Sequence, residues 1–152
     1  MNKTLLHLDK EDLQLLHGKM QLGRVKSGQV LVKEGVLPLG LFIVREGSVL
    51  VQRNINGYTI TTATLGINEM FGETAFVSPR PATASVVAAD DTDVIVLTPR
   101  RLQPLFDENP GLFGRFHRSL AHVLSRRLRA FNEQTGGPKK DRFGDLPSWE
   151  IL

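Results

Sequence analysis

Between Gly23 and Thr98 the chain is a run of short apolar segments, rich in β-branched residues and separated by glycine-containing turns. Each segment has the length of a strand rather than of a helix. The Asn56-Gly57 pair predicts a hairpin between two of them, because a type I′ turn requires positive φ at both central residues. Many short strands with regular glycine turns predict a mainly β, closed double-sheet structure, a jelly roll. The expected strands are Val30–Val32, Leu41–Arg45, Val49–Arg53, Tyr58–Leu65, Ala84–Ala89 and Val94–Thr98.

Helices are expected on both sides of this β region. Residues 4–20 predict a helix with Asp9 as its N-cap and Asp12 at the capping-box position, and residues 4–8 are alternatively an earlier turn. A short helical turn is expected at residues 104–109. A long amphipathic helix is expected over residues 111–134, because apolar residues recur there at three- and four-residue steps. Those residues are Phe113, Phe116, Leu120, Val123 or Leu124, Leu128 and Phe131.

Composition narrows the function classes. The 152 residues contain no cysteine, which excludes thiolate catalysis, cysteine metal sites and disulfides. The sequence has no phosphate-binding loop with its lysine, no His-Glu-x-x-His and no nucleophile elbow, so we do not expect an enzyme. The four histidines are scattered, and no metal site is expected. With no signal-peptide pattern and no apolar run long enough for a bilayer, we expect a cytoplasmic protein without membrane contact.

The net charge of +3 is unevenly distributed. Residues 115–142 carry eight arginines and lysines but only Glu133 and Asp141 as acids, whereas the preceding part of the chain is slightly acidic. This basic segment is either a solvated helix face or a surface that meets an anionic ligand or partner.

One segment interrupts the strands with a different pattern. Phe71-Gly72-Glu73-Thr74-Ala75 is expected to begin a helical stretch, and Pro81-Ala82-Thr83-Ala84-Ser85 follows it. The glycine allows the backbone to approach a ligand closely, and a helix start presents N–H groups to an anion. The carboxylate of Glu73 is able to accept hydrogen bonds from a sugar hydroxyl.

These two runs together resemble the phosphate-binding cassette of cyclic-nucleotide-binding domains, which occur in catabolite activator proteins and protein kinase A regulatory subunits. The resemblance extends to Gly28–Gly35, Leu41–Val49, Asp93–Leu97 and the helical run Ala121–Gln134. It implies a β-roll domain over residues 1–134, followed by a tail over residues 135–152. It also implies a regulatory sensor of bacterial type whose ligand is a cyclic nucleotide: cyclic AMP, cyclic GMP or a cyclic dinucleotide.

The resemblance assigns roles to cassette residues, with one departure. Glu73 would bind the ribose 2′-hydroxyl, and backbone N–H groups around Gly72, Thr74 and Ala75 would face the ligand. The family usually places an arginine for the cyclic phosphate nine residues after the glutamate, where this chain has Ala82, followed by Thr83.

This count aligns the chain with the family without an insertion or deletion, which we call the ungapped register. Arg80 offers two alternatives to it. A two-residue deletion would make Arg80 the phosphate arginine, but it would place Pro81, which has no N–H, where the family offers a backbone donor. In the other alternative Arg80 bends into the pocket and substitutes. If no arginine is present the ligand differs, or the pocket no longer binds one.

The C-terminal helix supplies further candidates. Its similarity to bacterial members places Arg127 near the ligand and Phe131 and Asn132 toward the base, where Phe131 would stack and Asn132 would hydrogen-bond. Phe131 alternatively belongs to the core or to a dimer seam, and Arg127 to a solvated face. The same helix, over residues 111–132, is expected to form a homodimer interface.

The sequence also bears on DNA and protein partners. The 18 residues after Gln134 are too few for a helix-turn-helix domain, so specific DNA binding is not expected. The main alternative to a nucleotide sensor is a β-roll that no longer binds a nucleotide and acts as a dimeric protein-interaction module. In that case residues 143–152, with Trp149, are a docking peptide; they are alternatively a lid over the pocket or a frayed terminus.

Overall fold

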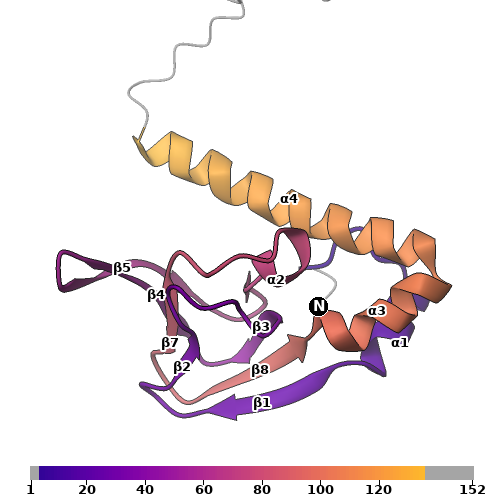
Figure 1. Ribbon diagram of the computed structural model, residues 1–152, viewed down its shortest axis with the longest axis horizontal. Coiled ribbons are helices and arrows are strands. Elements are labelled where there is room, and N and C mark those ends of the chain that lie inside the picture. Colours follow the sequence, from indigo (N-terminus) through magenta and orange to yellow (C-terminus); the bar gives the residue numbers. More distant parts are fainter. Residues whose placement is uncertain (1–3, 136–152) are drawn as a thin grey trace, which may run out of the picture.

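The computed structural model describes residues 4–135, and they form two four-stranded antiparallel sheets with flanking helices (Figure 1). Sheet A has the order β1-β8-β3-β6, and sheet B has the order β2-β7-β4-β5. This confirms the predicted double-sheet β-roll. The strands are β1 Gln21–Val25, β2 Val30–Val32, β3 Leu41–Glu46, β4 Val49–Ile55, β5 Tyr58–Leu65, β6 Met70–Phe71, β7 Ser85–Ala88 and β8 Thr92–Leu97.

The hairpin between β4 and β5 follows from its turn residues. Asn56 and Gly57 have φ of 53° and 83°, as a type I′ turn requires. The side chain of Asn54 supports the turn by accepting a hydrogen bond from the N–H of Gly57 at 3.0 Å. The strands pair from Ile55 with Tyr58 back to Val49 with Leu65, interrupted by a bulge between Val51 and Gln52. In Figure 1 this hairpin projects from one side of the roll.

The N-terminal helix is shorter than the longer of the two predictions. Helix α1 spans Lys10–His17, and residues 4–8 form the alternative turn. Asp9 and Asp12 make a reciprocal capping box, with N–H to carboxylate distances of 2.8 and 3.2 Å. Since Asp9 has extended backbone dihedrals, the helix cannot continue backward through it. β1, Gln21–Val25, follows; it was not among the expected strands, and it begins before Gly23, where the β region was expected to start.

Two helices follow the last strand. The prediction of a short turn at residues 104–109 is wrong: α3 spans Pro99–Glu108 and ends where that turn was expected. Thr98 caps α3 by accepting a hydrogen bond from the N–H of Arg101 at 3.3 Å, and Pro99 occupies the first helical turn, where its missing N–H costs nothing. Helix α4 spans Pro110–Thr135, close to the prediction.

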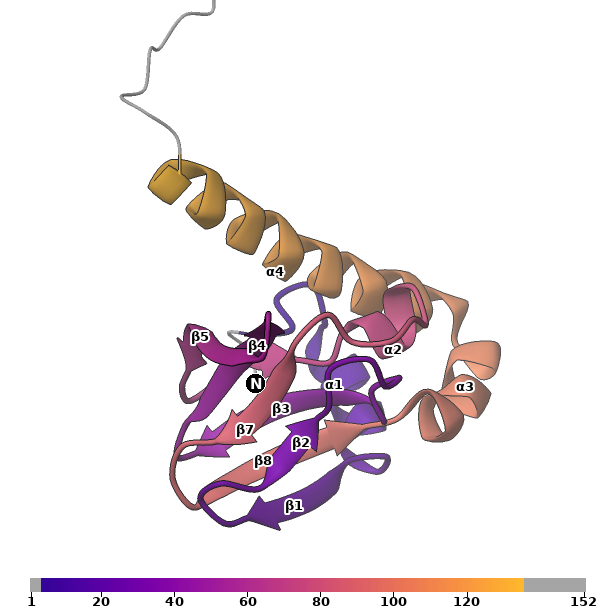
Figure 2. The ribbon, with the colours of Figure 1, turned by 60° about the vertical axis from the view of Figure 1, so that its left-hand side comes forward.

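The apolar side chains form two clusters. The first joins sheet A to the helices, and the second fills the interior of the roll between the sheets. Only the N-terminal half of α4 packs fully into the first cluster, through Leu112, Phe116 and Leu120. In Figures 1 and 2 this half lies beside α3, while the other half crosses above α2 toward the side of β4 and β5. Leu128 and Phe131, on that other half, are each 61% exposed.

A partly buried ion pair joins α4 to α1, with the Asp12 side chain 4% exposed and the Arg115 side chain 43% exposed. The Arg115 guanidinium on α4 donates to both carboxylate oxygens of Asp12 on α1, at 2.6 and 2.8 Å. The hydrogen bonds from Arg115 lower the pKa of Asp12, although burial acts in the opposite direction. The N–H of His7 donates to the hydroxyl of Ser119 one turn further along α4, so the N-terminal segment also holds this helix. The tail was expected over residues 135–152; Thr135 is the last residue of α4, and residues 136–152 lie outside the described residues.

Candidate functional site

A pocket of about 600 Å³ lies between the inner side of sheet B, the segment from Phe71 to Ala84, and the second half of α4. Nine of the eleven predicted site residues line it: Phe71, Gly72, Glu73, Thr74, Arg80, Ala82, Thr83, Arg127 and Phe131. They come from two segments far apart in sequence, and the structure brings them together. Ala75 and Asn132 do not line the pocket.

The floor of the pocket depends on Gly72. This residue has φ of 79°, and a Cβ there would overlap the carbonyl oxygen of Gly40. A side chain is therefore excluded both by backbone conformation and by space. Phe71, the preceding residue, lies in β6 rather than in a helix, and its ring stacks on Phe42 with centroids 5.0 Å apart.

The expected helical stretch is a single turn, α2 Thr74–Val77. Its first backbone bonds are donated by Ala75 to Gly72 at 3.2 Å and by Phe76 to Glu73 at 3.0 Å. The N–H groups of Glu73 and Thr74 precede these bonds, at the point where the chain borders the pocket. Ala75 instead turns its methyl group inward, and only 7% of the residue is exposed.

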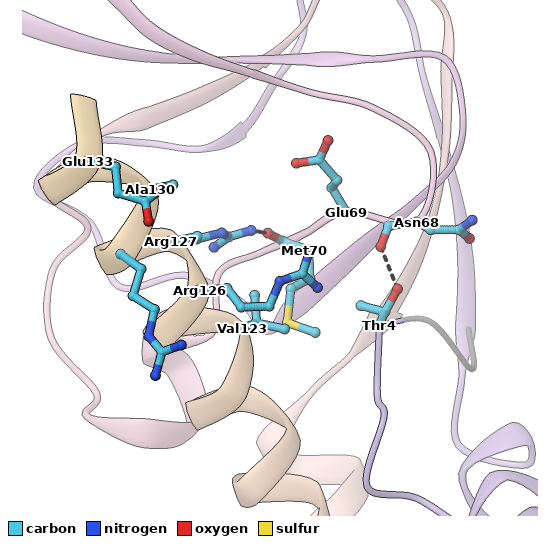
Figure 3. A pocket seen from close by; sticks show the side chains of 10 residues that line it. Thr4, Asn68, Glu69, Met70, Val123, Arg126, Arg127, Ala130 and Glu133 are labelled. Carbon is cyan, nitrogen blue, oxygen red and sulfur yellow. Dashed lines mark hydrogen bonds between the residues drawn. The ribbon is translucent and has the colours of Figure 1, made fainter. Parts of the chain in front are cut away.

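Glu73 is covered by α4. The carboxylate Oε1 of Glu73 lies 3.5 Å from Nη1 of Arg127, and 15% of the Glu73 side chain is exposed. Arg127 also donates through Nη2 to the carbonyl oxygen of Met70 (Figure 3). Arg127 thus joins α4 to the cassette, and its charge is already partly compensated.

The residue nine positions after Glu73 is held by the backbone. The N–H of Ala82 donates to Val36 at 2.9 Å, and its carbonyl accepts from Gly35 at 2.8 Å. Its methyl group packs against the apolar cluster inside the roll and lines the pocket. Arg80 lines the same pocket but is exposed, and no ion pair involves it within residues 4–135.

Helical geometry explains which α4 residues reach the pocket. Arg127, Ala130, Phe131 and Gln134 line it. They are spaced three, four and seven residues apart, so they share one helix face. Asn132 lies about 100° from Phe131 around the helix, since an α-helix has 3.6 residues per turn. Gln134 is the polar side chain that occupies this face instead.

Sequence reasoning missed the apolar lining of the pocket. Four strands of sheet B contribute residues that point inward, and a proline precedes β3. The two-residue alternation of the predicted strands could have indicated some of these inward-pointing residues. Ala63 and Leu65, two positions apart on one strand, must share a face of the sheet. The missed apolar residues are Val32, Pro38, Val51, Ala63, Leu65, Val86 and Ala130, and the polar ones include Glu69 and Ser78.

A second groove of about 580 Å³ also borders Arg127 (Figure 3). It shares Glu69, Arg127 and Ala130 with the main pocket. Arg126, Arg127 and Arg129 contribute three positive charges to it, and Glu69 and Glu133 contribute two negative charges. Because Arg127 is already bonded to Glu73 and Met70, the remaining arginines and glutamates of the groove balance in number.

No group of three or more metal-ligating side chains occurs in the part of the chain that the structure describes. Over that same part, no helix combines the length and the apolar character needed to span a membrane.

Comparisons with known proteins agree with this geometry. The sequence model of the family described as "Cyclic nucleotide-binding domain" matches residues 22–109. The Cyclic AMP receptor protein of Thermus thermophilus is 30% identical over 123 residues, which are 80% of this chain and 55% of that protein. Cyclic GMP-binding protein C of Dictyostelium discoideum is 25% identical over 142 residues, 93% of this chain and 5% of that protein.

A solved structure has the same fold. The crystal structure of a cyclic nucleotide-binding domain from Methylobacillus flagellatus superposes with a TM-score of 0.78 and 27% identity, covering 84% of this chain and 72% of that one. The chain spans at most about half the length of the two curated relatives named above. Domains of this type are regulatory rather than catalytic. The match over residues 22–109, together with the β-roll and its cassette pocket, establishes that this chain belongs to the cyclic nucleotide-binding domain family.

Proposed function

We propose that this protein is a non-enzymatic sensor domain that binds a cyclic nucleotide, or a related anionic nucleotide, in the pocket beneath α4. The observation that carries the proposal is the position of Glu73. Its carboxylate is mostly buried at the edge of a pocket of about 600 Å³, next to Gly72, where a Cβ would overlap the carbonyl oxygen of Gly40. A pocket of this size is in the range of small-molecule sites.

The cassette would hold the sugar and the phosphate. Glu73 accepts a hydrogen bond from the ribose 2′-hydroxyl, since an ionised carboxylate is an acceptor only. The N–H groups of Glu73 and Thr74 border the pocket and supply donors for phosphate oxygens. Gly72 permits the close approach of the backbone that these contacts need.

Phosphate recognition in this chain would be atypical. The backbone pairing of Ala82 with Gly35 and Val36 supports the ungapped register, which leaves a methyl group where the family has its arginine. A hydrogen bond to a charged group contributes about 1.5–3 kcal/mol, so losing that arginine weakens a cyclic monophosphate by about ten- to a hundredfold. Arg80 and Arg127 are the two cations of the pocket lining, and Arg127 is already paired with Glu73, so we propose that Arg80 turns inward when the ligand binds.

The second half of α4 would form the roof of the site. Phe131 is exposed and lines the pocket, and in this proposal its ring would stack on a nucleobase. Arg127 already contacts Glu73 and would position that carboxylate rather than the phosphate. Among the polar side chains on this face, Gln134 is placed to meet a base edge, while Asn132 faces away from the pocket lining.

Isothermal titration with cyclic AMP, cyclic GMP and cyclic di-GMP tests the proposal. The names of the relatives point to the first two, because one is a receptor for cyclic AMP and another binds cyclic GMP. We expect saturable heat with at least one of these ligands. Absence of heat with all three at millimolar ligand would contradict the proposal.

The exposed apolar residues of α4 favour a second candidate function, that of a dimeric protein-interaction module. Leu128 and Phe131 are 61% exposed on the second half of α4, and Ala82 deprives the pocket of its usual charge. A β-roll that had lost its nucleotide would use this face in a homodimer over residues 111–132 and act as a protein-interaction module. We propose the same homodimer for the nucleotide-binding form, with residues 1–134 as the folded unit, in the cytoplasm and without specific DNA binding.

A further inference from the structure

The charged side chains that line the main pocket cancel in number. Two are acidic, Glu69 and Glu73, and two are basic, Arg80 and Arg127. Arg127 is already engaged, since its Nη1 lies 3.5 Å from Oε1 of Glu73 and its Nη2 donates to the carbonyl oxygen of Met70 (Figure 3). Even with Arg80 turned fully inward, the lining therefore supplies no excess of positive charge to a phosphate.

The inner wall of the pocket is apolar where the family has its phosphate arginine. Ala82 presents a methyl group there, and both Ala82 and Val51 pack against the apolar cluster inside the roll. Val32, Leu65 and Val86 extend the same wall. A charged group that leaves water for such a surface loses hydration that the surface does not replace. A ligand without that charge does not meet this cost.

The groups that would hold the ribose are still present. Only 15% of the Glu73 side chain is exposed, and its carboxylate has about four acceptor sites on two oxygens. The contact with Arg127 is at the outer limit of a hydrogen bond and involves Oε1. Most of the acceptor capacity of Glu73 is therefore left for sugar hydroxyls.

An uncharged ribonucleoside uses this carboxylate more fully than a 3′,5′-cyclic nucleotide does. The 3′-oxygen of the cyclic nucleotide is esterified to phosphate, so the 2′-hydroxyl is the one ribose hydroxyl left to donate. A nucleoside has adjacent 2′- and 3′-hydroxyls, and both are able to donate to Glu73. Hydrogen bonds to an ionised acceptor are stronger than those between neutral groups. The nucleoside therefore gains at Glu73 part of what it lacks at the phosphate.

We propose that the pocket beneath α4 also binds the uncharged ribonucleoside that shares the base and ribose of its cyclic nucleotide, and that the phosphate adds less than about tenfold to the affinity. This inference rests on the proposed function, because the base and the ribose keep the contacts assigned to them there. It adds a ligand class: the domain responds to a nucleoside as well as to the corresponding cyclic monophosphate.

Paired titrations of the full-length protein test the inference. Adenosine is compared with cyclic AMP, and guanosine with cyclic GMP, so that the two ligands of a pair share a base and differ at the phosphate. We expect at least one nucleoside to bind within about tenfold of its cyclic monophosphate, or more tightly. If both nucleosides are more than about tenfold weaker, or give no heat at millimolar concentration, the inference is overturned.

The same titrations keep the two proposals apart. If the nucleosides fail and a cyclic nucleotide binds, the inference falls and the proposed function stands. If a nucleoside binds and no cyclic nucleotide does, the inference stands and the proposed function falls. If none of these ligands binds, the inference falls with the nucleotide pocket itself.

Deoxynucleosides distinguish recognition of the ribose from binding of the base alone. The 2′-deoxy and 3′-deoxy forms of the responsive nucleoside each lack one of the two hydroxyls that would donate to Glu73. Each should bind about tenfold or more weakly than the ribonucleoside, because each loses a hydrogen bond to a charged acceptor. Binding of both deoxy forms as tight as that of the ribonucleoside would overturn the inference.

A variant that restores the arginine should separate the two ligands. Ala82→Arg should strengthen the cyclic monophosphate by about ten- to a hundredfold and leave the nucleoside nearly unchanged. Ala82→Leu is the matched control, because it adds bulk without charge and should affect both ligands alike. Equal strengthening of both ligands by Ala82→Arg would contradict the inference. The titrations of the native protein decide the question if this variant does not fold.

Discussion

Arg127 on α4 lies with its Nη1 3.5 Å from the Oε1 of Glu73 in the cassette, although 54 positions separate the two residues in the chain. The same guanidinium donates to the carbonyl of Met70, immediately before the cassette. A ligand that engages Glu73 must therefore share this carboxylate with α4. The contact ties the second half of α4 to the cassette.

Replacing the carboxylate tests its role in the ligand site. Glu73→Gln should weaken binding of the responsive cyclic nucleotide by about ten- to a hundredfold, because a hydrogen bond to a charged acceptor contributes about 1.5–3 kcal/mol. The melting temperature should change little, since the ion pair with Arg127 is long. Titration calorimetry and thermal unfolding measure the two effects. Unchanged affinity in a folded variant would remove Glu73 from the ligand site.

Restoring the missing arginine tests the ungapped register. Ala82→Arg should strengthen binding of a cyclic monophosphate by about ten- to a hundredfold, because the side chain at this position lines the pocket. Titration of cyclic AMP and cyclic GMP measures the gain. Ala82→Leu serves as a control that fills space without adding charge, and it should not strengthen binding. No gain with arginine would favour the gapped register.

Arg80 separates the two remaining explanations for phosphate recognition. If Arg80 compensates for Ala82, Arg80→Ala should weaken binding of a cyclic monophosphate by about tenfold or more, since each 1.4 kcal/mol corresponds to about a factor of ten. Arg100→Ala, another exposed arginine that does not line the pocket, is the matched control. Identical affinities for the two variants would show that the phosphate is held without Arg80.

Two glycines with similar backbone conformation should respond differently to the same change. Gly72→Ala combines a positive φ with an overlap at Gly40, so we expect a loss of about 2–5 kcal/mol in the free energy of unfolding. Gly57→Ala has the positive φ alone, with nothing within 4 Å of the added carbon, and should cost about 1–2 kcal/mol. Denaturant titration compares them. Equal losses would mean that the Gly40 contact relaxes without cost.

The ion pair between Asp12 and Arg115 predicts a pH dependence of stability. Its hydrogen bonds lower the folded-state pKa of Asp12 below the ordinary value of 3.8. A carboxyl with a lowered pKa stabilises the fold above its unfolded pKa, and that contribution is lost as pH falls through the folded pKa. The melting temperature of the native protein should therefore decrease below about pH 4, and Arg115→Gln should reduce the part of this decrease that comes from Asp12.

A second ion pair provides the control for that measurement. Arg24 and Asp93 are also bonded, at 2.8 Å, but 81% of the Arg24 side chain is exposed. Exposed pairs contribute little to stability, so Arg24→Gln should leave the acid profile close to that of the native protein. If both substitutions change the profile equally, the stabilisation does not depend on the burial of Asp12.

Much of this architecture was predictable because it depends on local chemistry. The hairpin turn at Asn56-Gly57 and the capping box of Asp9 with Asp12 involve neighbours in sequence, and the structure confirms both. The start of α3 was missed even though Thr98 and Pro99 carry a helix-start signal. β6 was missed because two residues are too few to show any periodicity.

The sequence alone therefore determined the double-sheet β-roll and the flanking helices, since turns, caps and short periodic segments are encoded by adjacent residues. The tertiary structure alone decided that Arg127 meets Glu73 and that Gln134 rather than Asn132 faces the pocket. These relationships depend on the angle at which α4 crosses the roll and on the order of strands in each sheet. That angle is set by long-range contacts such as Asp12 with Arg115, which no local pattern in the chain specifies.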